Sequence, residues 1–381
     1  MNEFFDLNMI NPALKEALLK QNIVALTEIQ KKAIPEALKN KDIVVQSETG
    51  TGKTLAYLVP LFQKTEIQKH ETQAIILTPT HELAIQVLRQ IELLSLNAGM
   101  MISSTPIIGN VNIDRQIDKL KAKPHIIVGS AGRILELIKK KKIAAHTVKT
   151  IVIDEADTLI DKNNLETVRE VIKCTQKDRQ LMMFSATITN EAKERAIELM
   201  KQPEFISDTK KATVPDSIEH MYFMAESREK IEVLRKIIRI MKPSKALLFV
   251  SEREQLDILT ERLLYHGIKV KSLHGDKQKN DRKTAMNEFR SGKIQVLAVT
   301  DIAARGLDIE GVTHIINMDI PEKVKIYLHR AGRTGRMGKK GIAVSIVSKQ
   351  EEPIIFDYEK SLNITISPKN TFKDAIIDLK K

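Results

Sequence analysis

The amino-acid sequence predicts an α/β protein with two domains, each a parallel sheet flanked by helices, joined by a short linker. Two series of short apolar runs alternate with helical stretches such as Lys193–Lys201 and Lys230–Met241. The runs are β-branched and continuous, which is typical of strands buried on both faces of a parallel sheet. Two sets of five therefore indicate two sheets. The first set is Asp42–Gln46, Ala74–Thr78, His125–Gly129, Thr150–Ile153 and Leu181–Ser185, and the second is Ala246–Val250, Lys269–Leu273, Gln295–Val299, His314–Asp319 and Ile342–Val347.

The domain boundaries follow from the length and from one irregular stretch. A chain of 381 residues has room for two or three domains, each with its own core. Gln202 to Ser217 contains two prolines and no sustained hydrophobic period, so we expect a linker there. We place the first domain at residues 1–205, the linker at 206–217 and the second domain at 218–381, which Pro353 to Lys381 would complete.

Composition excludes several classes of protein. No run of about 18 apolar residues is present, and the N-terminus lacks the basic and apolar regions of a secretory signal. The single cysteine, Cys174, rules out an internal disulfide and is expected to be a small packing residue. No Cys/His cluster has zinc spacing. We therefore expect a soluble, cytoplasmic protein that makes no membrane contact, and nothing in the sequence demands more than a monomer.

The charge balance points to a polyanionic partner. The formal net charge is +12, and aromatic residues make up only 4% of the chain, with no tryptophan. Basic charge favours phosphate, whereas few aromatics argue against a surface on which bases stack, so contact with a nucleic-acid backbone is expected. The run Lys139 to Lys142 closes a predicted helix at Ile134–Ile138, where helix capping and solvation are favoured over a dedicated binding patch.

A glycine-rich octapeptide follows the first predicted strand. A turn between a strand and a helix presents backbone N–H groups and the positive helix end to phosphate. Lys53 can then reach the β- and γ-phosphates, and the Thr54 hydroxyl can hold Mg²⁺. Ser47 stands where the strict pattern has Gly, but Gly50 and Gly52 keep the tight turn; an ordinary helix start is the alternative. The expected phosphate-binding residues are Ser47, Glu48, Thr49, Gly50, Thr51, Gly52, Lys53 and Thr54.

An acidic tetrapeptide, Asp154-Glu-Ala-Asp157, follows the fourth predicted strand. An Asp at that position can hold the metal, and a Glu can act on the attacking water. A solvated acidic turn is the alternative, which the preceding apolar strand and the order behind the phosphate loop disfavour. Together the two motifs predict hydrolysis of a nucleoside triphosphate.

A third dense motif, His329-Arg-Ala-Gly-Arg-Thr-Gly-Arg336, lies in the second half. Planar guanidinium groups suit bidentate phosphate contact and stabilise charge that develops during phosphoryl transfer. A flexible basic loop is the alternative. We expect these arginines to face the phosphate loop across a cleft, so that ATP would lie between the two domains.

With these motifs the chain resembles the DEAD-box ATP-dependent RNA helicases, which have two RecA-like domains. The resemblance runs from about Phe4 to Ser348, with the motifs in the order of the family. It implies ATP and Mg²⁺ as cofactors and RNA as a partner held through its backbone with little sequence specificity. Protein partners would supply targeting.

The resemblance also assigns the nucleotide contacts. Thr27 and Gln30, in Thr27-Glu-Ile-Gln30, resemble the segment that reads adenine, and Phe5 would stack on the base, although a simple core aromatic is the alternative. Asn22, Ile23 and Leu26 replace the usual Gly, Phe and Pro. Asp308 resembles the residue that contacts the ribose.

The catalytic roles are implied in the same way. Lys53 and Thr54 match the phosphate and magnesium residues, Asp154 would hold Mg²⁺ mostly through water, and Glu155 would position or deprotonate the attacking water. The arginine fingers correspond to Arg333 and Arg336. Coupling of the nucleotide site to the domain interface is assigned to Asp157, Ser185, Thr187 and His329.

RNA contacts are expected from both domains. The matching residues are Pro79, Thr80, His81, Glu82, Gly109, Ser130, Gly132, Arg133, Arg282, Thr300 and Asp301. The chain departs from the family pattern at His81, Asn110, Ala131 and Lys279, where Arg, Gly, Pro and Gln are usual. Neutral His at position 81 removes a permanent cation. The hydrolytic motifs have almost no such departures, so hydrolysis is expected to be intact and RNA affinity to be altered.

Three functions remain open at this point. The chain is expected to be an RNA-dependent ATPase that closes two domains over RNA and unwinds short duplexes or remodels RNA–protein complexes. An ATP-gated RNA clamp with little unwinding is the alternative. A DNA helicase or remodeller is disfavoured by the adenine segment and the acidic tetrapeptide.

Overall fold

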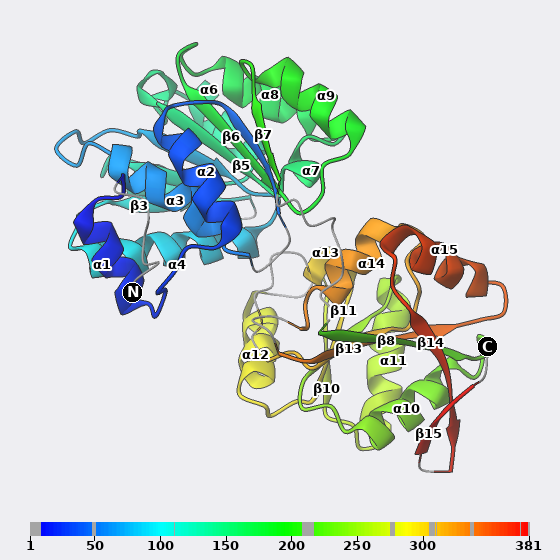
Figure 1. The fold of residues 1–381 in the computed structure, drawn as a ribbon. Coiled ribbons are helices and arrows are strands. Elements are labelled where there is room, and N and C mark those ends of the chain that lie inside the picture. The colour runs from blue at the N-terminus through cyan, green and yellow to red at the C-terminus, as the bar shows by residue number, and fades with distance from the viewer. Residues whose placement is uncertain are drawn as a thin grey trace. The chain divides into compact units, whose positions relative to one another are not determined.

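The computed structural model describes most of the chain as two compact units, Met1–Lys211 and Ala212–Lys381 (Figure 1). The described residues are 9–47, 51–109, 111–207, 217–274, 279–304, 309, 311–335, 339–373 and 375–379, without the side chains of Lys279, Asn280, Lys283, Ile302 and Lys325. Within these ranges, no helix has the length and apolar character needed to cross a membrane.

The first unit is built on a seven-stranded sheet with the order β3-β4-β2-β5-β6-β1-β7, and all its pairings are parallel. Its core strands are fully buried apolar runs, as expected for a parallel sheet covered on both faces. The strands are β1 (Ile43–Gln46), β2 (Ala74–Leu77), β3 (Ser104–Ile107), β4 (Ile126–Gly129), β5 (Thr150–Asp154), β6 (Gln180–Ser185) and β7 (Glu204–Ser207).

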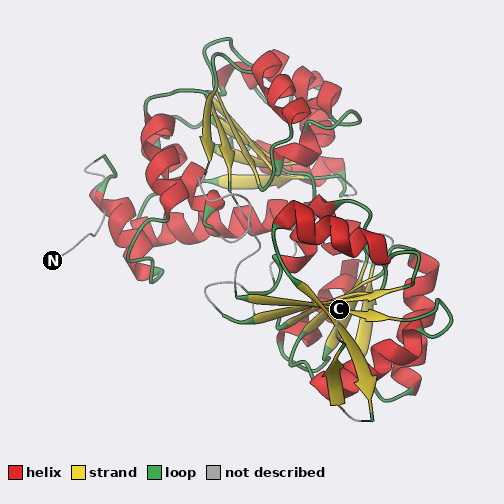
Figure 2. Ribbon diagram, turned by 45° about the vertical axis from the view of Figure 1, so that its right-hand side comes forward, coloured by secondary structure: helices red, strands yellow, loops and turns green. Residues whose placement is uncertain are grey.

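Helices cover both faces of this sheet (Figure 2). Alternate strand residues point to opposite faces, so Val45 packs with α1 to α4 whereas Val44 packs with α6 to α9. The first group is α1 (Pro12–Lys20), α2 (Glu28–Leu38), α3 (Lys53–Lys64) and α4 (His81–Ala98). The others are α5 (Ile113–Leu120), α6 (Ala131–Lys139), α7 (Ala156–Leu159), α8 (Leu165–Lys173) and α9 (Asn190–Leu199), with a 3₁₀ turn at Ala145–Thr147.

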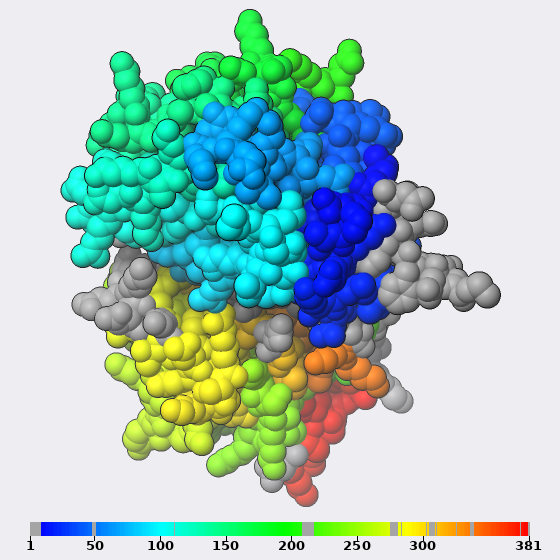
Figure 3. All heavy atoms as spheres, turned by 90° about the vertical axis from the view of Figure 1, so that its left-hand side faces the viewer, coloured from blue at the N-terminus to red at the C-terminus, as the bar shows by residue number. Residues whose placement is uncertain are grey.

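Helix α1 is attached to the outside of α4. In Figure 3 the dark-blue surface of α1 adjoins the cyan surface around the end of α4. The Lys20 ammonium donates to the Asn97 carbonyl at 3.2 Å. Helix α4 begins at Thr80, whose hydroxyl accepts from the Leu83 N–H, and ends at Gly99 in the left-handed conformation. These caps fix where the segment that precedes α4 meets the sheet.

The second unit is built on an eight-stranded sheet with the order β10-β11-β9-β12-β13-β8-β14-β15. Its pairings are parallel except that of β14 with β15, which is antiparallel. The sheet is thus parallel-dominated, as predicted. The strands are β8 (Ile218–Met224), β9 (Ala246–Phe249), β10 (Val270–Leu273), β11 (Val296–Val299), β12 (His314–Asn317), β13 (Gly341–Val347), β14 (Ile366–Phe372) and β15 (Ala375–Asp378).

The helices of the second unit divide between the two faces of its sheet. Residues of α10 and α11 form one buried cluster, and those of α12 to α15 form two clusters on the other face. The helices are α10 (Lys230–Met241), α11 (Arg253–Tyr265), α12 (Lys279–Arg290), α13 (Asp301–Ala304), α14 (Val324–Ala331) and α15 (Glu352–Leu362). Helix α15 and strands β14 and β15 bring the end of the chain into this unit.

The structure differs from the sequence-based expectation in three respects. Strands β3, β7, β8, β14 and β15 were not expected. Strand β7 lies in the stretch expected to be a linker, because Glu204–Ser207 pairs with β1, and it occupies residues 206 and 207 of the proposed boundary. Cys174 is exposed rather than packed.

A buried histidine makes the second unit sensitive to acid. His220 in β8 is 5% exposed, and its Nδ1 lies 2.7 Å from the Tyr327 hydroxyl. Burial lowers the pKa of His220 from 6.5 to about 4. The pKa of His220 is lower in the folded than in the unfolded state. Neutral His220 therefore contributes fully to the free energy of unfolding above pH 6.5, and this contribution is lost as pH falls toward 4. The loss amounts to about 3 kcal/mol for such a shift.

We therefore expect the free energy of unfolding, measured with urea between pH 7 and pH 4, to fall less steeply in His220→Gln than in the wild type. His314, whose pKa burial also lowers, keeps its own contribution in both proteins. The exposed His146, changed to Gln, is the matched control. An unchanged acid slope in His220→Gln would contradict this assignment.

Candidate functional site

The carboxyl edge of the first sheet gathers the predicted hydrolytic motifs. Strands β5, β6 and β1 are neighbours, with Gln46 opposite Ser185 and Asp154 opposite Phe184. The phosphate loop follows β1, the acidic tetrapeptide begins at the end of β5, and Ser185 ends β6. Parallel strands end at the same edge of their sheet, where ligands of open α/β sheets bind. Three motifs far apart in sequence are therefore brought to adjacent strand ends.

The described part of the phosphate loop is held by its own polar groups. The Ser47 N–H donates to the Ser185 carbonyl at 3.0 Å, and the hydroxyls of Ser47 and Thr51 are 2.6 Å apart. The Lys53 ammonium donates to the Ser47 carbonyl. Helix α3 begins after Gly52, whose φ of 87° is left-handed and favours glycine. Glu48, Thr49 and Gly50 lie outside the described residues.

The segment expected to read adenine contacts this loop directly. The Thr27 hydroxyl donates to the Thr51 carbonyl at 2.8 Å, and the Gln30 side-chain amide donates to the Gly52 carbonyl at 3.0 Å. The Gln30 carbonyl oxygen also accepts from the Thr27 N–H at 3.0 Å. A Cβ at Gly52 would lie 2.2 Å from the Gln30 amide nitrogen. Gln30 therefore holds the start of α3 in addition to the role predicted for it, and Phe5 lies outside the described residues.

The Asp154 carboxylate is buried and held on both sides. It is 5% exposed, Oδ1 accepts from the Glu155 N–H at 2.9 Å, and Oδ2 accepts from the Tyr57 hydroxyl at 2.8 Å. Burial raises the pKa of Asp154, whereas the Tyr57 hydrogen bond and the charge of Lys53 oppose that rise. The carboxylate is thus fixed in orientation between two donors.

Glu155 has an unusual backbone conformation. Its φ of 50° and ψ of 49° place a residue with a side chain in the left-handed region, at the cap of α7. Such conformations cost on the order of 1–3 kcal/mol and concentrate at functional sites. Backbone strain therefore coincides with the carboxylate that the sequence predicts to act on water.

Tyr57 is a site residue that the sequence analysis missed. It lies one turn along α3 from Thr54, is fully buried, and packs edge-on against Phe184 with ring centroids 5.1 Å apart. Its hydroxyl donates to Asp154. Burial raises the pKa of Tyr57 well above its usual range, although the neighbouring Thr54 side chain acts to lower that pKa, and the hydroxyl therefore stays protonated. A tyrosine hydroxyl that becomes buried needs a hydrogen-bond partner. This rule is the signal in the sequence that could have pointed to Tyr57.

Asp157 is brought to the end of β6, as the sequence predicts. The Thr187 hydroxyl donates to Asp157 Oδ2 at 3.3 Å. The Ser185 hydroxyl donates to the Thr187 carbonyl at 2.7 Å and accepts from the Thr187 N–H at 3.2 Å. The acidic tetrapeptide and Ser185–Thr187 therefore form one hydrogen-bonded group within the first unit.

The segments predicted to contact RNA follow three further strands of that edge, β3, β4 and β2, which are also neighbours. Pro79 and Thr80 follow β2, and His81 and Glu82 open α4. Gly109 follows β3, whereas Asn110 lies outside the described residues. Ser130 precedes α6, in which Ala131, Gly132 and Arg133 form the first turn. The sheet thus separates predicted RNA segments from predicted hydrolytic ones along a single edge.

Two contacts hold the β3 and β4 ends close together. A Cβ at Gly129 would lie 1.7 Å from the Ile107 carbonyl oxygen, so only glycine allows this approach. The Arg133 guanidinium donates to the Val111 carbonyl at 3.0 Å and pairs with Glu136 at 3.1 Å. Arg133 therefore holds the segment after Gly109 in addition to its predicted role.

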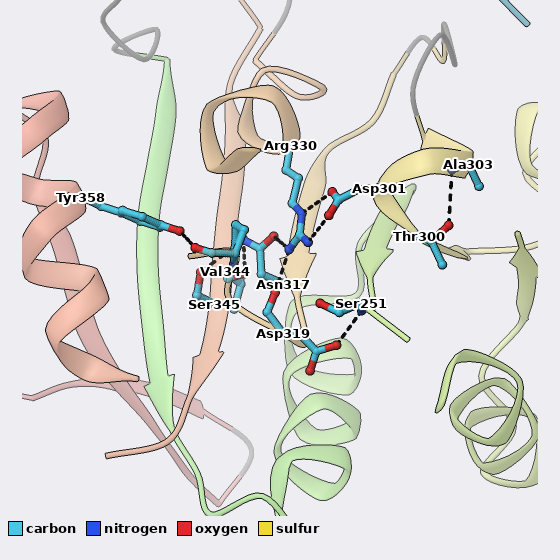
Figure 4. Close-up of polar contacts among 11 residues, drawn as sticks. Ser251, Thr300, Asp301, Ala303, Asn317, Asp319, Arg330, Val344, Ser345 and Tyr358 are labelled. Atoms are coloured by element: carbon cyan, nitrogen blue, oxygen red, sulfur yellow. Dashed lines mark hydrogen bonds and ion pairs between the residues drawn. The ribbon is translucent and has the colours of Figure 1, made fainter. Parts of the chain in front are cut away.

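In the second unit, a buried arginine organises the carboxyl edge (Figure 4). Arg330 in α14 is 2% exposed and pairs bidentately with Asp301, with both N–O distances 2.7 Å. It also donates to the Asn317 side chain at 3.0 Å and to the Asp319 carbonyl at 2.7 Å. Its guanidinium carbon lies 4.8 Å from the centroid of the Phe249 ring. Arg330 was not singled out from the sequence, although it lies inside the arginine-rich motif.

The remaining predicted residues of the second unit that are described lie in α12, α13 and α14 or in the segments next to α13 and α14. The Thr300 hydroxyl accepts from the Ala303 N–H at 3.3 Å, which starts α13 with Asp301 as its first residue. His329 lies in α14, Arg333 in the turn after it, and Arg282 in α12. Arg336, Asp308 and the side chain of Lys279 lie outside the described residues. The Asp301 carboxylate, predicted to face RNA, is bonded to Arg330.

The donor set on the first unit suits Mg²⁺, which prefers oxygen ligands. The Thr54 hydroxyl and the Asp154 carboxylate are both oxygen donors, and the Tyr57 hydroxyl is hydrogen-bonded to Asp154. No group of three or more His, Cys, Asp or Glu side chains gathers as a metal cage in the described parts of the chain. A site of few protein ligands, completed by water and phosphate, is the form that Mg²⁺ usually takes.

Both halves of the chain match models of known protein families. Residues 27–195 match the family model of the DEAD/DEAH box helicase, and residues 229–338 match that of the helicase conserved C-terminal domain. The chain is 43% identical to the DEAD-box ATP-dependent RNA helicase CshC of Bacillus cereus, over 97% of this chain and 94% of the relative. It is 39% identical to the probable ATP-dependent RNA helicase YfmL of Bacillus subtilis, over 90% of each.

Solved protein structures also resemble the structure of this chain. S. cerevisiae Dbp5 bound to RNA and ADP BeF3 has a TM-score of 0.88 and 29% identity, covering 96% of this chain and 95% of that one. A DEAD box protein from Methanococcus jannaschii has a TM-score of 0.55 and 32% identity, covering 96% and 98%. The fold is therefore that of tandem RecA-like domains.

Proposed function

Because the chain belongs to the family of DEAD-box ATP-dependent RNA helicases, we propose that it hydrolyses ATP in response to RNA. The two domains would close over RNA, and closure would locally unwind short duplexes or remodel RNA–protein complexes. Little sequence specificity is expected, since the predicted contacts reach the backbone and not base edges. Protein partners would direct the enzyme to its targets.

One observation carries this proposal: the division of the carboxyl edge of the first sheet. Hydrolytic segments follow β5, β6 and β1, whereas the segments assigned to RNA follow β3, β4 and β2. Strands β2 and β5 pair directly, so the two groups share a boundary within one continuous sheet. A displacement of the segments assigned to RNA would thereby reach the strand that ends in Asp154. Coupling between two ligands needs such a shared element.

The residues of the first unit would divide the chemistry among them. Lys53 and the loop N–H groups would hold the phosphates, and Gln30 and Thr27 would connect the base to the loop. Mg²⁺, when bound, neutralises charge on the phosphates; Thr54 and Asp154 would hold it, Asp154 mostly through water. Glu155 would orient the attacking water and take its proton. Tyr57 would keep the Asp154 carboxylate turned toward this site.

The second unit would complete the reaction through its arginine-rich motif. Arg333 and Arg336 are proposed to stabilise charge on the transferring phosphoryl group, and Arg282, Thr300 and Asp301 are assigned to RNA. Because phosphate loop and arginines belong to different domains, hydrolysis would require closure. Closure completes catalytic sites in many enzymes.

The test is steady-state ATP hydrolysis with no nucleic acid, with single-stranded RNA and with single-stranded DNA, each at two salt concentrations. Stimulation by RNA and not by DNA is expected, and it should weaken as salt rises because backbone contacts release counterions. Glu155→Gln provides the background rate. Equal stimulation by DNA would contradict the assignment of RNA as the partner.

A second measurement on the same protein distinguishes an ATP-gated RNA clamp from an enzyme that unwinds RNA. Unwinding of a short RNA duplex in ATP is compared with retention of single-stranded RNA in a nonhydrolysable ATP analogue. Unwinding is expected. Retention of RNA without unwinding would assign the chain to the clamp class.

Arg336→Ala is expected to lower turnover by about 10³-fold or more while changing ATP affinity much less, as for an arginine that contacts only the transition state. The measurements are kcat with saturating RNA and the dissociation constant of a fluorescent ATP analogue. Lys339→Ala, a nearby exposed cation, is the control. An effect of Arg336→Ala confined to affinity would remove Arg336 from the catalytic set.

A further inference from the structure

The amino-terminal edge of the second sheet carries a concentration of basic residues, all of them exposed except the half-buried Lys245. Strands β9, β10 and β11 are parallel neighbours whose first residues, Ala246, Val270 and Val296, are in register. The loops that lead into these strands therefore lie side by side. We define the basic edge as six residues at this end of the sheet, namely Arg239, Lys242, Lys245, Arg262, Lys269 and Lys293.

Hydrogen bonds and a ring contact connect these loops and the helix ends beside them. The Lys245 ammonium donates to the Arg290 carbonyl at 2.9 Å, which joins the start of β9 to the end of α12. The Gln295 N–H donates to the Lys269 carbonyl at 2.8 Å, which joins the starts of β11 and β10. The Arg235 guanidinium lies 3.0 Å from the His266 ring, which joins α10 to the end of α11. The basic edge is therefore one continuous surface.

Its cations are not neutralised locally. None of the six forms an ion pair with another described residue, whereas surface lysines such as Lys20, Lys39 and Lys121 pair with acids one turn away. Exposed ion pairs contribute little to stability. The absence of such pairs among these six residues therefore matters mainly for the electrostatic potential around the protein. The basic edge presents positive charge that is available to a polyanion.

Helix capping explains only part of this charge. Helices α10, α11 and α12 all end at this edge, and cations near helix C-termini are favourable. However, Lys245, Lys269 and Lys293 lie in the loops before the strands and not in the last turn of a helix. Half of the basic edge therefore has no capping role.

An exposed aromatic ring lies within the same surface. Tyr265 ends α11 and is 87% exposed, with its ring edge-on to that of His266 at 5.2 Å between centroids. An apolar ring kept in solvent beside cations suits stacking by an unpaired base. Arginine and lysine on both sides can hold the adjoining phosphates.

We propose that the basic edge is a second RNA-binding surface, which holds single-stranded RNA through its phosphates, with Tyr265 stacking on one base. It differs from the surface assigned above, because Thr300 and Asp301 follow the carboxyl ends of the strands. Four-residue strands separate the two edges by roughly 13 Å. The inference rests on the proposed function, since it takes RNA as the partner. The surface binds RNA without nucleotide and keeps it near the domains between cycles.

The test compares two full-length variants with the same change in net charge. The first carries Arg239→Glu, Lys269→Glu and Lys293→Glu on the basic edge. The second carries Lys177→Glu, Lys193→Glu and Lys201→Glu, three exposed cations of the first unit with no ion pair to a described residue. Nucleotide-free affinity is measured for single-stranded RNA of ~30 and ~6 nucleotides at several salt concentrations, because only the longer RNA reaches beyond one surface. Tyr265→Ala is measured separately.

We expect the basic-edge variant to bind the long RNA at least tenfold more weakly than the control variant. The slope of log K against log salt should fall by about 2, as for three phosphate contacts on a single strand. Affinity for the short RNA, and kcat at saturating RNA, should match the control. Tyr265→Ala should weaken binding of the long RNA several-fold. The slope of log K against log salt should stay unchanged, because stacking releases no counterions.

Equal affinity of the two triple variants for long RNA would overturn the inference while leaving RNA-stimulated hydrolysis, and hence the proposed function, intact. Absence of RNA stimulation in the wild type would instead contradict the proposed function itself. Binding of vesicles containing phosphatidylserine serves as a further arm. Loss of vesicle binding by the basic-edge variant, with RNA binding equal to the control, would assign the surface to a membrane and also overturn the inference.

Discussion

Glu155→Gln is expected to bind ATP and RNA as the wild type does and to lose about 10³-fold in turnover. The amide is isosteric with the carboxylate and can still orient water, but it cannot take a proton at neutral pH. The left-handed backbone at position 155 belongs to the fold of the β5–α7 turn and should persist. The measurements are kcat with saturating RNA, the dissociation constant of a fluorescent ATP analogue, and retention of RNA with ATP.

Glu166→Gln is the matched control, because Glu166 is an exposed carboxylate on α8 that pairs with Arg169. It undergoes the same chemical change outside the site and should leave kcat unaltered. Turnover in Glu155→Gln equal to that of the wild type would remove Glu155 from its role toward water. Loss of ATP affinity together with turnover would point to a role in holding the nucleotide.

Arg330→Met is expected to lower the free energy of unfolding of the second unit by about 3–5 kcal/mol, because it leaves the Asp301 carboxylate partly buried without its partner. Asn317 and the Asp319 carbonyl also lose a donor. The double variant Arg330→Met/Asp301→Asn removes the orphaned charge and should recover part of the loss. Urea unfolding of the three proteins measures both quantities.

Arg169→Met provides the comparison for this prediction. Arg169 contacts the carboxylates of Glu166 and Glu198, whereas Arg330 contacts that of Asp301, but the Arg169 side chain is 32% exposed. A solvent-exposed pair of this kind contributes about 1 kcal/mol or less. Similar losses in Arg330→Met and Arg169→Met would show that burial of the Arg330–Asp301 pair has no energetic consequence.

The strands found from sequence are those buried on both faces. Runs such as Ile43–Gln46 and Val296–Val299 are continuous and apolar, so periodicity alone identifies them. The missed strands lack that pattern. Strand β3 contains Pro106 and lies at a sheet edge, where proline is tolerated, and β14 contains Pro368. Strand β7, at the opposite edge of the first sheet, is largely exposed, so its apolar signal is weak.

The site could be predicted where chemistry depends on residues that are consecutive in the chain. Asp154, Lys53 and Ser185 were found because each belongs to a short motif behind a strand, and the sheet order explains why those motifs meet. Tyr57 and Arg330 were not found, because their roles depend on partners about 97 and 29 residues away. Only the fold decides that a buried hydroxyl meets Asp154 and that one arginine among three faces Asp301. The roles predicted for the catalytic, nucleotide and RNA contacts all stay predictions.

The conformation of Glu155 sets stability and activity against each other at one position. Glycine would adopt a φ of 50° without the steric cost that a side chain incurs, so relief of strain favours Glu155→Gly in the folded state. The same change would remove the only carboxylate assigned to the attacking water. If Glu155 acts on the attacking water as proposed, the change that relieves this strain also abolishes turnover. Under the proposed role, the strained glutamate is a local cost in stability that the fold bears for the sake of turnover.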